Sequence, residues 1–137
     1  MRKLGLLLSF AVLFGVSAAA FAQEEETKAE SALKVSESAV CTAISDRQPE
    51  GTASEFSKDV AKIYYWTRID GASGDETVKH VWYAGDNVIG EVSLNIKTPS
   101  YRTWSSKTVY PGLEGDLSVA VVDAEGNVLK KDAFKIQ

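Results

Sequence analysis

The chain has little of the chemistry on which most enzymes and metal sites depend. It contains one histidine and one cysteine among 137 residues. A single cysteine excludes an internal disulfide, and one histidine with one distant cysteine gives too few ligands for a transition metal. Basic charge is also scarce, with 15 Lys and Arg against 19 Asp and Glu. Because an acidic protein repels phosphate backbones, we expect no nucleic acid partner.

The first 22 residues are typical of a cleavable secretory signal. Arg2 and Lys3 supply the positive charge, residues 4–20 are uncharged, and Ala20-Phe21-Ala22 fits the small-x-small cleavage rule. We therefore expect cleavage after Ala22 and a periplasmic or secreted protein. The alternative is a retained anchor, because residues 4–22 approach the ~20 apolar residues that span a bilayer. Membrane attachment is expected only in that case.

Residues 23–32 form an acidic segment with four glutamates and no large apolar side chain. Such a segment cannot bury enough surface to offset its ordering entropy, so we expect a flexible linker. The remaining residues, 33–137, are of a length suited to one domain.

In residues 33–137, apolar side chains recur with period two between turn signals. This pattern predicts an all-β fold, a single immunoglobulin-like antiparallel β-sandwich of about seven strands. Large side chains on both faces of 60–69 predict a central strand, and 77–110 is expected to form an antiparallel meander. Pro49 is expected to end strand pairing, and Cys41 to be buried and inert. The predicted strands are 35–44, 60–69, 77–84, 88–97, 101–110, 117–122 and 128–136.

Eight of the ten aromatic residues after the signal lie between Tyr64 and Tyr110. Most of these rings are expected to pack in the core, because burying one ring removes ~150–250 Å² of its surface from water. Strands with large residues on both faces must nevertheless expose some rings. Period two also places Arg102 and Trp104 on one face, where the guanidinium can stack. The candidate ligand-binding residues are His80, Trp82, Tyr83, Arg102, Trp104, Ser105, Ser106 and Lys107.

The single imidazole leaves two other interpretations open. A hydrolase could use His80 with Ser105 or Ser106, but the sequence has no nucleophile elbow, and we expect no enzyme. Alternatively, His80, Arg102, Ser105 and Ser106 form a buried polar network that fixes strand register. We expect no cofactor and no metal site, although the oxygen-rich loop 70–76 leaves calcium undecided.

Several segments together resemble a bacterial family, the domain-of-unknown-function 2914 family. They are His80-Val-Trp-Tyr83, Val92-Ser-Leu94, Tyr101-Arg-Thr-Trp-Ser-Ser-Lys107, Gly115, Leu117-Ser-Val-Ala-Val-Val-Asp123 and Gly126-Asn-Val-Leu129. The resemblance covers about 40–136. It implies a small all-β exported or membrane-attached domain with no assigned activity. The family's signature positions correspond to His80, Trp82, Arg102, Ser105, Ser106 and Lys107.

The sequence thus predicts an exported, non-enzymatic binding module of the cell envelope. Aromatic faces stack on sugar rings, and Arg and Lys recognise carboxylates or phosphates. The expected partner is therefore an envelope glycan or another protein. A purely structural domain is the alternative.

Overall fold

The computed structural model describes residues 32–137, so the expected signal peptide and nearly all of the expected linker lie outside it. The described residues form ten strands and no helix. The strands are β1 (Lys34–Cys41), β2 (Ala43–Ser45), β3 (Gln48–Glu50), β4 (Glu55–Phe56), β5 (Lys62–Asp70), β6 (Glu76–Ala84), β7 (Asn87–Ile96), β8 (Ser100–Thr108), β9 (Gly115–Asp123) and β10 (Val128–Ile136).

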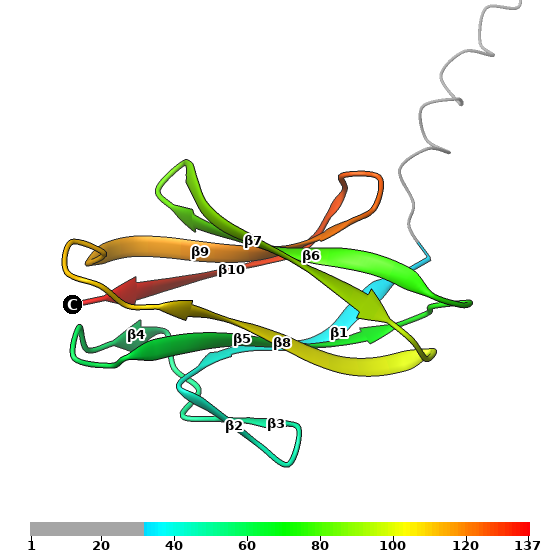
Figure 1. The fold of residues 1–137 in the computed structure, drawn as a ribbon, viewed down its shortest axis with the longest axis horizontal. Helices are drawn as coiled ribbons and strands as arrows, with labels where there is room; N and C mark the ends of the chain where they lie inside the picture. Colours follow the sequence, from blue (N-terminus) through cyan, green and yellow to red (C-terminus); the bar gives the residue numbers. More distant parts are fainter. Residues whose placement is uncertain (1–31) are drawn as a thin grey trace, which may run out of the picture. The chain divides into compact units, whose positions relative to one another are not determined.

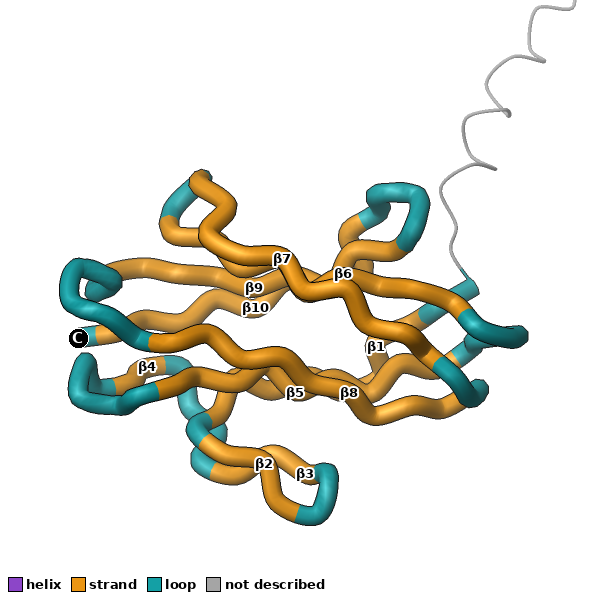
Figure 2. Tube along the Cα trace, viewed as in Figure 1, coloured by secondary structure: helices purple, strands orange, loops and turns teal. Residues whose placement is uncertain are grey.

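Two sheets pack face to face as a sandwich (Figures 1 and 2). One has three strands in the order β1-β5-β8, and the other has five in the order β4-β10-β9-β6-β7. A separate hairpin of β2 and β3 lies beyond the three-stranded sheet, on the side away from the five-stranded sheet (Figure 1). The predicted all-β sandwich is confirmed.

Each of the seven predicted strands overlaps a strand of the structure, and in most of them alternating side chains bury one face. On β6, for example, Val78, His80 and Trp82 are at most 1% exposed, whereas Lys79 between them is exposed. β5 buries side chains on both faces and lies between β1 and β8, as its composition predicts.

The predicted meander over 77–110 is wrong in its third strand. β6 and β7 form the expected hairpin, but β8 crosses to the other sheet and pairs with β5 from Lys62↔Thr108 to Asp70↔Ser100. The link from β7 to β8 is only residues 97–99, which is short enough to suggest a hairpin. Crossing gives the doubly buried β5 a neighbour on each side and turns the inner face of β8 toward β6.

The first predicted strand, 35–44, also differs from the structure. β1 ends at Cys41, and the chain then forms the β2–β3 hairpin through a turn at Asp46 and Arg47, both with positive φ. The expectation that Pro49 ends pairing is wrong, because Pro49 pairs with Ile44. β3 has a partner on one side only, so a residue without an N–H is tolerated there.

Polar bridges join the two sheets along both open sides of the sandwich. On one side, Tyr65 Oη and Ser38 Oγ each donate a hydrogen bond to Asp132 Oδ2, at 2.6 and 2.8 Å. On the other, Lys107 Nζ donates to the carbonyl of Ile89 at 2.7 Å. These hydrogen bonds link the two sheets along both sides of the core.

Candidate functional site

Three side chains form a buried polar cluster between the sheets, which we call the inner network: Thr67, His80 and Ser105. His80 is fully buried, its Nε2 lies 3.1 Å from Thr67 Oγ1, and its Nδ1 lies 2.7 Å from Ser105 Oγ. Thr67 Oγ1 also donates to the carbonyl of Thr103 at 3.4 Å. With the proton on Nε2, the imidazole donates to Thr67 and accepts from Ser105, so both of its nitrogens are bonded.

Burial controls the protonation of this cluster. It lowers the pKa of His80 to about 3, because a charged imidazole would lose its hydration with no anion beside it. His80 is therefore neutral across the physiological range. A neutral imidazole with both nitrogens hydrogen-bonded is typical of a histidine that belongs to the core.

Trp82 and Tyr83 follow one another on β6 and face opposite sides of the sheet. Trp82 is 1% exposed, and its ring packs edge-on against Tyr65 and Phe134 at 6.4 and 6.1 Å. Tyr83 lies half-buried on the outer side of the five-stranded sheet, where Lys131 Nζ is 4.5 Å from its ring centroid. Tyr83 and Arg102 thus lie on different sheets.

The outer face of the three-stranded sheet carries the other candidates from β8. Arg102, Trp104 and Ser106 alternate with the inward Thr103 and Ser105. Arg102 lies opposite Arg68, and Trp104 lies opposite Trp66. The prediction that Arg102 and Trp104 share a face is confirmed, and an aromatic pair and an arginine pair occupy successive positions along the same two strands.

The β2–β3 hairpin covers part of this outer face. Trp66 donates from Nε1 to the carbonyl of Arg47 at 2.9 Å, and is only 3% exposed although it points away from the core. Arg47 extends its guanidinium over Trp104, at 6.0 Å from the ring centroid, and donates to the carbonyl of Arg102 at 3.3 Å. Cys41 is also fully buried, and burial raises its pKa.

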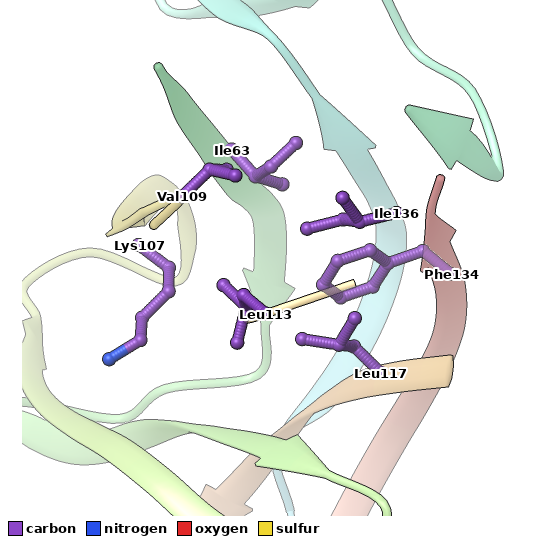
Figure 3. A pocket seen from close by; sticks show the side chains of 7 residues that line it. All are labelled: Ile63, Lys107, Val109, Leu113, Leu117, Phe134 and Ile136. Atoms are coloured by element: carbon purple, nitrogen blue, oxygen red, sulfur yellow. The ribbon is translucent and has the colours of Figure 1, made fainter. Parts of the chain in front are cut away.

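Lys107 belongs to neither group. It reaches across to β7 at the edge of the sandwich and lines a small apolar pocket with Leu113, Phe134 and others (Figure 3). The pocket has no room for even a water molecule, whereas typical ligand pockets have ~300–1,000 Å³. Gly90 of β7 lies beside the end of this side chain, and a Cβ there would be 3.4 Å from Lys107 Nζ, an ordinary van der Waals contact.

The eight sequence candidates are therefore distributed over four places. His80, Trp82 and Ser105 are in the interior, Tyr83 is on the outer side of the five-stranded sheet, Arg102, Trp104 and Ser106 are on the outer face of the three-stranded sheet, and Lys107 is at the β7–β8 edge. Sequence reasoning missed Arg47 and Arg68. The alternation of Tyr64, Trp66 and Arg68 on β5 was the available signal for Arg68, whereas Arg47 is placed by a hairpin that was not predicted.

Two other features bear on the sequence predictions. Within residues 32–137, no group of three or more His, Cys, Asp or Glu is placed to hold a metal ion. In the loop considered for calcium, Glu76 instead accepts a hydrogen bond from the backbone N–H of Ser73 at 2.9 Å. The described part of the chain also contains no helix long and apolar enough to cross a membrane.

Residues 75–136 match the model of a family described as "Protein of unknown function (DUF2914)". The resemblance to DUF2914 is confirmed. The DUF2914 match spans β6 to β10 and includes all eight sequence candidates, but it begins later than the expected residue 40. Arg47, Thr67 and Arg68 thus precede the matched DUF2914 region.

No curated protein matches this chain. Among solved structures, an endonuclease/exonuclease/phosphatase from Beutenbergia cavernae DSM 12333 is similar, with 15% identity and a TM-score of 0.32. The similarity covers 76% of this chain and 35% of that one, so this chain spans about a third of that protein. The likeness is too weak to bear on fold or function.

Proposed function

We propose that this protein is an exported, non-enzymatic module that binds an envelope glycan through the outer face of the three-stranded sheet. The observation that carries this proposal is the placement of Arg68, Arg102 and Trp104 side by side on that face, with Arg47 beside them. Sugar rings stack on aromatic faces, and guanidinium groups bind the acidic substituents of sugars. The signal-like N-terminus supports an extracytoplasmic partner.

The burial of the inner network supports a binding role over a hydrolytic one. Ser105 and His80 are within hydrogen-bonding distance, but they are 7% and 0% exposed, and the ring nitrogens of His80 bond to Thr67 and Ser105 and not to a carboxylate. Ser106 is exposed but points to the opposite face of β8. A fluorophosphonate probe that labels the purified protein at Ser105 or Ser106 would contradict the non-enzymatic proposal.

The proposal is tested by retention on insoluble, purified envelope polysaccharide. The protein is obtained by expressing the full chain in an exporting host. Trp104→Ala should reduce retention about tenfold or more, since truncating a Trp that anchors a binding surface typically costs ~2 kcal/mol or more. Tyr110→Ala is the matched control, because Tyr110 is an exposed aromatic residue, at 44%, on the loop after β8. Equal retention of both variants and the unmodified protein would overturn the proposal.

A further inference from the structure

Three charged side chains lie in register across the outer face of the three-stranded sheet, and we call them the arginine rung: Glu37, Arg68 and Arg102. Glu37 of β1 pairs with Arg68 of β5, and Arg68 pairs with Arg102 of β8. Side chains directly opposite in an antiparallel pair have Cβ atoms ~4.5–5.5 Å apart, and like charges there repel. Two arginines in this position are therefore unfavourable for the sheet unless an anion lies between them.

The two arginines differ in how far their charge is already satisfied. Arg68 Nε lies 3.0 Å from Ser100 Oγ, to which it donates, and 3.6 Å from Asp70 Oδ1. The guanidinium of Arg102 has no hydrogen bond or ion pair with any residue of 32–137. Arg47 adds a third guanidinium nearby, through its contact with the Arg102 carbonyl. All three arginines of the described chain therefore gather on one face of an acidic protein.

The arginine rung forms the floor of a polar groove. Ser100 and Gln48 complete its lining, and its volume is about 320 Å³. Two other surface grooves have similar volumes, of about 310 and 300 Å³. The lining of one includes Asp75, Glu76 and Glu125, and the lining of the other includes Lys58 together with Asp59 and Glu114. Volume therefore does not distinguish the groove at the arginine rung from the other two. Its two guanidinium groups distinguish it, and the guanidinium of Arg102 is unpaired among the described residues.

We propose that this groove binds the oxyanion substituent of a glycan, a carboxylate or a phosphate, and this rests on the binding function proposed above. Arg102 supplies the planar fork that fits two oxygens of one anion, and Arg68 with Ser100 completes the cradle. Glu37 and Gln48 accept hydrogen bonds from the sugar hydroxyls beside the anion. Trp104, two residues along β8 from Arg102, lies where an adjoining sugar ring can stack.

The test is isothermal titration calorimetry with four soluble polymers. Galacturonate oligomers carry a carboxylate, and their methyl esters are the neutral match. Phosphorylated dextran carries a phosphate, and plain dextran is its neutral match. We expect binding to one charged polymer at least tenfold tighter than to its neutral match. Which charged polymer binds identifies the source of the oxyanion.

Variants then locate the binding. Arg102→Gln should weaken the affinity for the charged polymer tenfold or more, and Arg102→Lys several-fold, because Lys keeps the charge but loses the fork. Lys79→Gln removes the same charge from the exposed side of the other sheet, and should change the affinity less than twofold. Unfolding curves for each variant confirm that the fold is intact.

Three outcomes would overturn the inference. One is equal loss of affinity in Arg102→Gln and Lys79→Gln, which would indicate a general charge effect. Another is equal affinity for a charged polymer and its neutral match, which would show that no oxyanion is recognised. If Trp104→Ala abolishes that binding, the proposed glycan function stands without the oxyanion site. The third is no binding to any of the polymers. Retention on envelope polysaccharide then decides separately whether the proposed function also falls.

Discussion

The two faces of the β5–β8 pair handle polar side chains in opposite ways. On the inner face, Thr67 and Ser105 bond to one neutral imidazole, and each polar atom of the inner network has a partner. On the outer face, Arg68 and Arg102 lie opposite one another with like charge. Buried polar groups must be satisfied for the chain to fold, whereas a charge that keeps contact with water need not be paired. The difference separates side chains that hold the sandwich together from those available to a ligand.

The largest effect should come from breaking the inner network. His80→Leu leaves the hydroxyls of Thr67 and Ser105 without their imidazole partner, and each unsatisfied group costs about 1–3 kcal/mol. We expect the free energy of unfolding to fall by about 2–5 kcal/mol in urea titrations. The triple variant with Thr67→Val and Ser105→Ala removes the stranded hydroxyls and should recover part of that loss. A loss below about 1 kcal/mol in the single variant would show that the network is not structural.

The next largest effect should come from lowering the pH. In the unfolded chain His80 takes up a proton near its ordinary pKa of 6.5, whereas in the folded protein its pKa is about 3. The stability it contributes is fully present above pH 6.5 and is lost as the pH falls toward 3. Between pH 6.5 and 5 the free energy of unfolding should drop by about 1.6 kcal/mol, because the slope rises from half of ~1.4 kcal/mol per unit at pH 6.5 toward its full value. His80→Leu should show no such slope, and an equal slope in both proteins would refute the assignment.

Tyr65→Phe tests the bridge between the sheets that lies next to the inner network. The hydroxyl of Tyr65 donates to the carboxylate of Asp132, and both burial and that neighbouring charge raise the pKa of Tyr65. Removing the hydroxyl should cost about 1.5 kcal/mol, at the low end for a bond to a charged group, because Ser38 still bonds Asp132. Tyr64→Phe, on the outer face of the same strand, should change the unfolding free energy by less than about 0.5 kcal/mol.

The smallest effect is expected at the arginine rung. Arg102→Thr removes one of two opposed like charges and places a β-branched residue in a strand, so stability should be unchanged or higher by up to about 0.5 kcal/mol. Arg68→Thr is the contrast, because it also removes the bond to Ser100. Thermal unfolding of both variants measures this. If Arg102→Thr lowered stability by more than about 1 kcal/mol, the outer face would be as structural as the inner one.

The sequence predicts the positions of the strands well, but it predicts poorly which strands pair with one another. Period two indicates which side chains of β5, β6 and β8 share a face, and the structure agrees for Arg102 with Trp104 and for His80 with Trp82. It does not indicate which strands pair, since the short link at 97–99 is compatible with both a hairpin and a crossing. That ambiguity kept Arg68 out of the predicted site, because its position opposite Arg102 depends on the pairing of β5 with β8.

Pro49 affects how readily another polypeptide can add to the edge of the β2–β3 hairpin. The β2–β3 hairpin stands out from the sandwich, and a free strand edge is a template onto which another polypeptide can add. β3 is continuous through Pro49, but this middle residue has no N–H to offer to an added strand. Pro49 thus makes the edge of β3 a poorer template for the addition of another strand.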